Sequence, residues 1–175
     1  MQANIYIEAD NKAPRRQKRK YGYVLECICR GQTRTVEQFD FIEETFHGTM
    51  VTALEKALIR FNKPCEITVH APDAWLLDML ENQLEKWAAG DFLNSQGKPI
   101  SYQKQWMHIW LLAKQHEIYG QRGPHAYSEW MKEEMKNAGS REDLSVPGAD
   151  PGREGHAHTE KTHAPGEEIP ASHAV

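Results

Sequence analysis

The sequence of 175 residues contains few cysteines, no long apolar run and no excess of basic side chains. Its three cysteines, Cys27, Cys29 and Cys65, are too few and too odd in number for a disulfide framework, which indicates a reducing compartment. No segment approaches the roughly 18 consecutive apolar residues of a membrane helix, and the first residues lack the pattern of a secretory signal. We therefore expect a cytoplasmic monomer with no membrane partner.

Aromatic residues are absent from residues 139–175, where Gly, Pro, Ser, Thr and charged residues predominate. Such a segment cannot bury enough apolar surface to offset the entropy of ordering it, so we predict a disordered tail after a domain of residues 1–138. The tail holds three basic and seven acidic side chains and so carries the whole net charge of −4. The acidic balance therefore does not exclude a nucleic-acid partner for the domain.

Strand formers dominate the first part of the domain. Residues 5–9 alternate like a strand that ends at Asp10, and residues 21–30 and 33–41 predict a hairpin. The segment 12–20 between the first two strands predicts a loop with a concentration of positive charge. Its five closely spaced bases are Arg15, Arg16, Lys18, Arg19 and Lys20.

Apolar residues at helical spacing dominate the rest of the domain. Helices are predicted at residues 51–61, 77–87, 106–113 and 127–137, with short strands at 66–69 and 117–119 and a turn at 120–124. Asp73 is the expected N-cap of the second helix, and the tryptophans Trp87, Trp106 and Trp110 are expected in the core. Three antiparallel strands followed by parallel crossovers predict an α/β fold, with helices packed on a mixed five-stranded sheet.

The order of these elements and several segments within them resemble the type 1 ribonuclease H family. The resemblance covers roughly residues 4–137 and is clearest at residues 5–10, 21–25, 57–67 and 87–100. It implies a ribonuclease H-like fold and hydrolysis of the RNA strand of RNA/DNA hybrids with two divalent cations, Mg²⁺ or Mn²⁺.

Members of this family hold the cations with four acidic side chains, and the resemblance places these positions at Asp10, Met50, Pro72 and Lys132. A thioether and an ammonium group cannot hold Mg²⁺, which prefers oxygen ligands. Asp73 lies one residue after the third position, so the expected metal site is Asp10 with Asp73, weak or absent. His125 corresponds to the flexible loop histidine of the family, which makes Asp10, Asp73 and His125 the candidate catalytic residues.

The remaining candidates are nucleic-acid contacts. The five bases of the predicted loop favour phosphates, although a solvated charged hairpin explains them equally well. The resemblance adds Thr45, which matches a threonine that contacts DNA phosphate, and His47, which falls where the family reads the ribose. Phe92 and Lys98 fall on the family's protrusion, a region that grips the DNA strand.

Three functions fit these residues. The favoured one is a ribonuclease H-like protein that binds RNA/DNA hybrid or duplex nucleic acid with reduced or lost hydrolysis. The second is an active divalent-metal endoribonuclease that supplements Asp10 and Asp73 with Glu43, Glu44 or Glu133. The third is a catalytically inactive scaffold that binds protein through its tail.

Overall fold

A computed structural model of the protein describes residues 1–29 and 31–142. The strands are β1 (Gln2–Ala9), β2 (Gln17–Cys29), β3 (Gln32–Glu44), β4 (Glu66–Ala71) and β5 (Glu117–Arg122). The helices are α1 (Phe46–Leu58), α2 (Ala74–Asp78), the π-helix η1 (Met79–Gln83), α3 (Leu84–Ala89), α4 (Gln103–Ala113) and α5 (Ser128–Glu142). In the described part of the chain, no helix is both long and apolar enough to span a bilayer.

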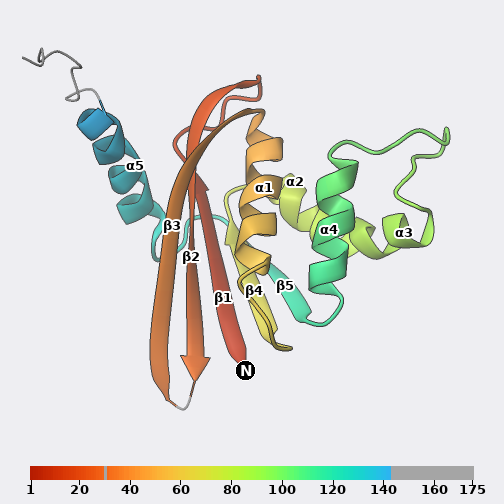
Figure 1. Ribbon diagram of the computed structural model, residues 1–175, viewed down its shortest axis with the longest axis horizontal. Coiled ribbons are helices and arrows are strands. Elements are labelled where there is room, and N and C mark those ends of the chain that lie inside the picture. The colour runs from red at the N-terminus through yellow and green to blue at the C-terminus, as the bar shows by residue number, and fades with distance from the viewer. Residues whose placement is uncertain (30, 143–175) are drawn as a thin grey trace, which may run out of the picture. The chain divides into compact units, whose positions relative to one another are not determined.

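The strands form one mixed sheet in the order β3-β2-β1-β4-β5 (Figure 1). Strands β1, β2 and β3 pair antiparallel, whereas β1, β4 and β5 pair parallel. This confirms the predicted fold class. Because parallel strands end at the same edge of a sheet, the carboxyl ends of β1, β4 and β5 lie together, and functional groups tend to gather at such edges.

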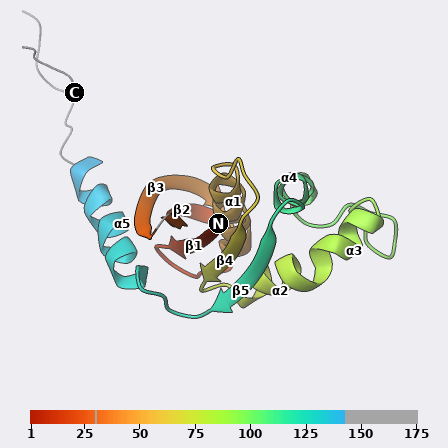
Figure 2. The ribbon, with the colours of Figure 1, turned by 90° about the horizontal axis from the view of Figure 1, so that it is seen from below.

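Helices cover both faces of the sheet (Figures 1 and 2). Ile5 and Ile7 of β1 are fully buried in the core that includes α1 and α4, where Trp106 is also fully buried. Tyr6, between the two isoleucines, points to the other face and packs with Met131 of α5. The alternation of β1 therefore places every second residue under α1 and the others under α5.

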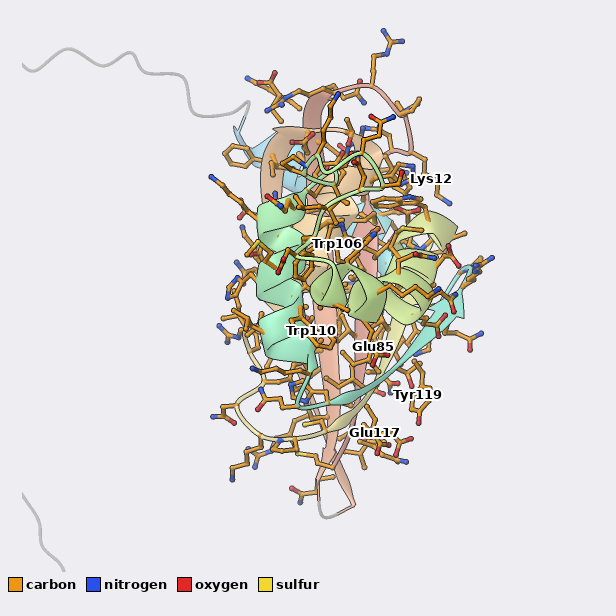
Figure 3. All side chains as sticks on the ribbon, turned by 90° about the vertical axis from the view of Figure 1, so that its right-hand side faces the viewer. Lys12, Glu85, Trp106, Trp110, Glu117 and Tyr119 are labelled. Carbon is orange, nitrogen blue, oxygen red and sulfur yellow. The ribbon has the colours of Figure 1, made fainter. Side chains whose placement is uncertain are left out.

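Where one helix was predicted at residues 77–87, the structure has three helical segments, α2, η1 and α3, that follow one another without a break. The N-cap of α2 is Asp73, whose side chain accepts a hydrogen bond from the N–H of Trp75 at 3.0 Å, so the predicted cap is confirmed. The ring of Trp106 lies 6.1 Å from that of Trp75 and 5.5 Å from that of Trp87, and Trp106 is fully buried, which confirms its core assignment. Figure 3 marks Trp106 on α4.

Two boundaries differ from the predictions. Strand β2 begins at Gln17, so the loop predicted at residues 12–20 is shorter, because its last residues pair with the end of β3. Strand β5 continues through Gly120, where we expected a turn. The N–H of Gly120 donates to the Glu81 carboxylate at 2.7 Å, and a Cβ there would lie only 3.0 Å from that carboxyl group.

The last described helix, α5, ends at Glu142 and so passes the boundary predicted at residue 138. The rest of the predicted tail lies outside the described residues.

Candidate functional site

Asp10 lies directly after β1, at the edge of the sheet where the parallel strands end, and it is exposed. Its Oδ2 accepts a hydrogen bond from the backbone N–H of Lys20 at 3.1 Å, and its Oδ1 accepts one from Asn11 Nδ2 at 2.8 Å. The carboxylate therefore anchors the start of the β1–β2 loop (residues 10–16) while part of it still faces solvent.

Asp73 follows β4 at the same edge, but it is only 3% exposed. In addition to capping α2 through Oδ1, its Oδ2 accepts a hydrogen bond from Nδ1 of His47 at 2.7 Å. The His47 side chain is 45% exposed and lies with its ring 4.6 Å from that of Trp75. Both oxygens of Asp73 therefore have partners in the protein, and the carboxylate orients an imidazole that solvent can reach.

The other positions that the resemblance assigns to metal ligands hold no carboxylate. Met50 is fully buried in α1, as part of the core. Lys132 lies in α5, and its Nζ is 3.2 Å from a carboxylate oxygen of Glu129. Glu44, a candidate replacement, uses one oxygen to accept the N–H of Thr45 at 2.8 Å.

Within residues 1–29 and 31–142, no three His, Cys, Asp or Glu side chains come together in a group that could hold a metal ion. The carboxylates of this edge are instead used singly, as a loop anchor at Asp10 and as a helix cap at Asp73.

His125 precedes α5 and is buried against β1 rather than facing solvent. Its side chain is 2% exposed, and Nε2 donates to the carbonyl oxygen of Ile7 at 3.2 Å. The same nitrogen lies 3.5 Å from Oε1 of Glu8, which accepts a hydrogen bond from Ser128 Oγ at 2.7 Å. Burial lowers the pKa of His125, so the ring is neutral at pH 7. This placement corrects the expectation of a flexible loop histidine.

A polar cluster continues from His125 along the same face of the sheet. Glu26 accepts hydrogen bonds from Asn4 Nδ2 at 2.9 Å and from the Tyr127 hydroxyl at 3.1 Å. Burial and the charge of Glu26 raise the pKa of Tyr6 to about 12, and the ring of His70 stacks on Tyr6 at 4.5 Å. Burial also lowers the pKa of His70, so uncharged tyrosine and histidine rings lie around the Glu26 carboxylate beneath the start of α5.

Arg19 is one of the five bases predicted to contact nucleic acid, but it is only 1% exposed. Its guanidinium donates to the carbonyl oxygens of Asn11 and Ala13 and to Oδ1 of Asn11, the last at 2.6 Å. It also lies 5.8 Å from the ring centroid of Phe46. Arg19 points inward because alternate residues of β2 face opposite sides. The expectation that it contacts nucleic acid is therefore corrected: Arg19 holds the β1–β2 loop in place.

The other four bases have different surroundings. Arg15, Arg16 and Lys18 are exposed, and Arg16 approaches a carboxylate oxygen of Glu44 only to 3.8 Å. Lys20 is half-buried, and its Nζ donates to the carbonyl oxygen of Met135 in α5 at 2.9 Å. Of these five bases, Arg15, Arg16 and Lys18 are thus exposed, and Arg19 fixes the loop that carries the first two.

Thr45 is the N-cap of α1 at this edge. Its Oγ1 accepts a hydrogen bond from the N–H of Gly48 at 3.1 Å and lies 2.5 Å from the hydroxyl oxygen of Tyr102. The hydroxyl of Thr45 therefore has two partners in the protein. The α3–α4 loop (residues 90–102) ends at this contact.

Phe92 lies in the α3–α4 loop, and it is 6% exposed. Its carbonyl oxygen accepts hydrogen bonds from the N–H of Ile100 at 3.2 Å and from Gln103 Nε2 at 3.1 Å. The ring belongs to the main core, which corrects the expectation that Phe92 contacts nucleic acid. Lys98 is exposed in the same loop, as a phosphate contact requires.

Sequence reasoning missed two features of this edge. One is the pairing of His47 with Asp73, because residues so far apart in sequence meet only through packing of α1 against α2. The other is Phe41, which lies opposite Lys20 in the β2–β3 pair and is 70% exposed. The exposure of Phe41 could have been predicted from the alternation of β3 if residues 17–20 had been recognised as the start of the strand that pairs with it.

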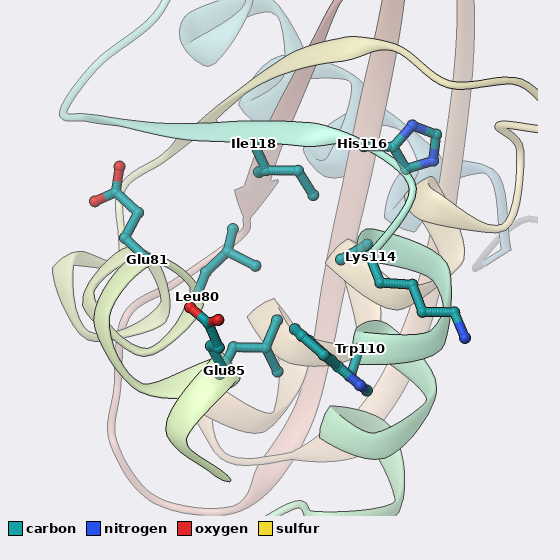
Figure 4. Close-up of a pocket in the computed structure, with 9 residues that line it drawn as sticks. Leu80, Glu81, Glu85, Trp110, Lys114, His116 and Ile118 are labelled. Atoms are coloured by element: carbon teal, nitrogen blue, oxygen red, sulfur yellow. The ribbon is translucent and has the colours of Figure 1, made fainter. Parts of the chain in front are cut away.

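A separate cavity of about 290 Å³ lies away from this edge, near the start of β5, and holds none of the predicted site residues (Figure 4). Glu85, Trp110 and His116 are among its lining residues, and the Nδ1 of His116 accepts the N–H of Cys65 at 3.1 Å. Burial lowers the pKa of His116, so it is neutral at pH 7.

Sequence comparison finds relatives of one kind, although no family model matches the chain. A ribonuclease H of Gluconobacter oxydans is 30% identical over 98 residues, which are 55% of this chain and 64% of the relative. A ribonuclease H of Acidiphilium cryptum is 28% identical over 76 residues, which are 43% of this chain and 48% of the relative. The chain thus spans less than two thirds of these curated relatives.

Solved structures with a similar fold include the PFV RNase H domain, with a TM-score of 0.59 at 14% identity, covering 80% of this chain and 94% of that chain. LC9-RNase H1, a type 1 RNase H with the type 2 active-site motif, has a TM-score of 0.57 at 14% identity, covering 80% of this chain and 74% of that chain. The foamy viral protease-reverse transcriptase in complex with RNA/DNA hybrid has a TM-score of 0.55 at 15% identity, covering 82% of this chain and 20% of that chain.

The structural matches show the fold, and the sequence matches agree with it. The chain therefore has a ribonuclease H-like fold and is similar in part of its sequence to ribonucleases H.

Proposed function

We propose that this protein binds RNA/DNA hybrid or duplex nucleic acid at the carboxyl end of β1 and that its hydrolytic activity is reduced or lost. The observation that carries the proposal is the β1–β2 loop. Arg19 fixes the loop through its carbonyl oxygens, and Arg15 and Arg16 of the loop are exposed next to Lys18. Exposed cations on a fixed backbone favour phosphates, because each contact releases condensed counterions from the nucleic acid.

Two further facts support binding. The matched relatives are ribonucleases H, and one protein with a similar fold is in complex with RNA/DNA hybrid. His47 is exposed at the same edge, where Asp73 orients its ring, so its free nitrogen is available to a ribose or phosphate oxygen.

The chemistry of the carboxylates supports the loss of hydrolysis. Two-metal hydrolysis needs several oxygen ligands that converge on two cations. Asp10 is exposed, but Asp73 is buried with both oxygens engaged, and the buried thioether of Met50 is a poor ligand for Mg²⁺. Lys132 adds a positive charge where the family has an aspartate, which would repel a cation.

The test combines binding and cleavage of one labelled RNA/DNA hybrid. Fluorescence anisotropy should show binding at low salt that weakens steeply as salt rises. Incubation of the same hybrid with Mg²⁺ or Mn²⁺ should leave the RNA strand intact, or cut it far more slowly than an active ribonuclease H does.

The possible outcomes separate the three functions. RNA cleavage that disappears in the Asp10→Asn variant would establish the endoribonuclease with a rearranged carboxylate set. Absence of binding to hybrid and to duplex at low salt would favour the protein-binding scaffold. Binding without cleavage supports the proposal.

A further inference from the structure

Phe41 is the most exposed of the large hydrophobic side chains in the described residues, at 70%. It lies on the edge strand β3, directly opposite Lys20. Phe39 points to the same side of β3, but its ring packs edge-on against Trp130 of α5, with ring centroids 5.7 Å apart. The helix therefore covers one of the two aromatic rings and leaves the other accessible.

A cavity of about 270 Å³ opens beside this ring, and the residues that line it are Asp10, Lys18, Arg19, Lys20 and Phe41. Its lining therefore includes one aromatic, one acidic and three basic residues, of which Lys18 is exposed and the Arg19 side chain points to the other side of β2. The volume lies just below the range of pockets that hold drug-sized ligands, so one flat ring system fits but a longer segment does not.

The charges around the cavity limit how a nucleotide can lie there. Asp10 and Lys18 both line the cavity and are exposed, so the carboxylate repels a phosphate and the ammonium group attracts one. Glu43 is paired with Lys18 across the β2–β3 ladder and is also exposed, so it disfavours a phosphate on the β3 side of Lys18.

We propose that this cavity holds one unpaired nucleobase, stacked on Phe41, next to the duplex that the β1–β2 loop binds. The proposal rests on the proposed function, because it extends the same binding surface along β3. An aromatic ring stacks on the face of a base, and that face is available only where the base is unpaired or at the end of a helix. The protein should therefore prefer a hybrid with a single-stranded overhang to a blunt hybrid.

The experiment compares a blunt RNA/DNA hybrid with the same hybrid extended by a short single-stranded overhang, both measured by anisotropy. The wild-type protein should bind the overhang about tenfold more tightly, since one base stacked on an aromatic ring contributes about that much. Phe41→Ala should remove this preference and change the affinity for the blunt hybrid less than about twofold. Phe41→Trp should retain the preference.

Leu111→Ala is the matched control, because Leu111 is also a large exposed side chain, at 58%, but lies on α4. It should leave both affinities unchanged.

Lys18→Ala should weaken binding to both hybrids and reduce the slope of log affinity against log salt by about 1, the value for one phosphate contact.

Two results would overturn the proposal and leave the proposed function standing. One is equal affinity of the wild-type protein for the blunt and the extended hybrid. The other is an equal loss of affinity for both hybrids in Phe41→Ala. If the wild-type protein binds neither hybrid at low salt, the proposed function itself fails, and the stacking site fails with it.

Discussion

Two loops border the start of α1, and they present opposite kinds of side chain. The β1–β2 loop is held by Arg19 of β2, which also contacts Phe46, and it carries exposed Arg15 and Arg16. The α3–α4 loop contacts Thr45 through Tyr102, buries the ring of Phe92 and carries only one basic residue. The difference indicates that positive charge is concentrated on one side of the sheet edge, while the loop on the other side serves packing.

The α3–α4 loop should depend on Phe92 for its stability. Phe92 and Asp91 both have φ of 56°, a left-handed conformation that burial of the ring must hold in place. Phe92→Ala should lower the free energy of unfolding by about 3 kcal/mol, measured by urea denaturation. Leu93→Ala, at an exposed neighbour, should change it by less than about 0.5 kcal/mol. Equal effects would show that the ring of Phe92 is not an anchor.

The β1–β2 loop should depend on Arg19 rather than on its exposed bases. Arg19→Met keeps most of the apolar stem but removes the hydrogen bonds to Asn11 and Ala13, so unfolding should become about 2 kcal/mol easier. Lys18→Met, one residue away and exposed, is the control and should have little effect on urea denaturation. A stable Arg19→Met variant would mean that the loop keeps its conformation without the guanidinium.

The exposed bases should dominate binding. Combined replacement of Arg15, Arg16 and Lys18 by Ala should lower the affinity for RNA/DNA hybrid by about 10- to 100-fold and reduce the slope of log affinity against log salt by about 2 to 3. Anisotropy titrations at several salt concentrations give both values.

A charge-matched control for this triple variant uses exposed bases far from the end of β1, namely Arg60, Lys63 and Lys114. Their combined replacement by Ala should change the affinity less than about threefold. If the two triple variants weaken binding equally, the affinity depends on the overall charge of the protein and not on the bases near the β1–β2 loop.

Neither loop contains a histidine, whereas β4 of the sheet contains His70. A fall in pH should therefore lower the free energy of unfolding before it changes the charge of either loop. Burial lowers the pKa of His70, His116 and His125, so the unfolded chain binds more protons as pH falls below about 6.5. Stability should therefore be full above that pH and fall by about 1 kcal/mol or more by pH 5.5, measured by urea denaturation. His125→Gln should flatten this dependence, and an unchanged slope would mean that His125 is not held neutral.

Lys98 provides the smallest expected effect. It is exposed in the α3–α4 loop, but the loop offers no second cation nearby to share a phosphate. Lys98→Ala should lower the affinity for hybrid less than about threefold. A loss as large as that of the Arg15, Arg16 and Lys18 variant would place the binding surface on both loops.

Much of the fold could be predicted because local patterns and global topology agree. Alternation located the strands, apolar spacing located the helices, and Asp73 was found as a cap because an acidic residue before an apolar stripe satisfies free N–H groups. The start of β2 was missed because its first residues are charged, and only pairing with β3 makes them a strand. The π-helix η1 had no signal in the apolar spacing.

The sequence by itself determined which chemical groups are present: one aspartate after β1, a thioether and an ammonium where the resemblance places metal ligands, and a cluster of five bases. Only the tertiary structure decided which of these groups are available. Lys18 and Arg19 are both basic and adjacent in β2, yet Arg19 is buried against loop carbonyls and Lys18 is exposed, because alternate residues of a paired strand face opposite sides. The tertiary structure also decided that Phe92 is buried and Phe41 is exposed, because the apolar character of a ring does not determine whether another element packs over it.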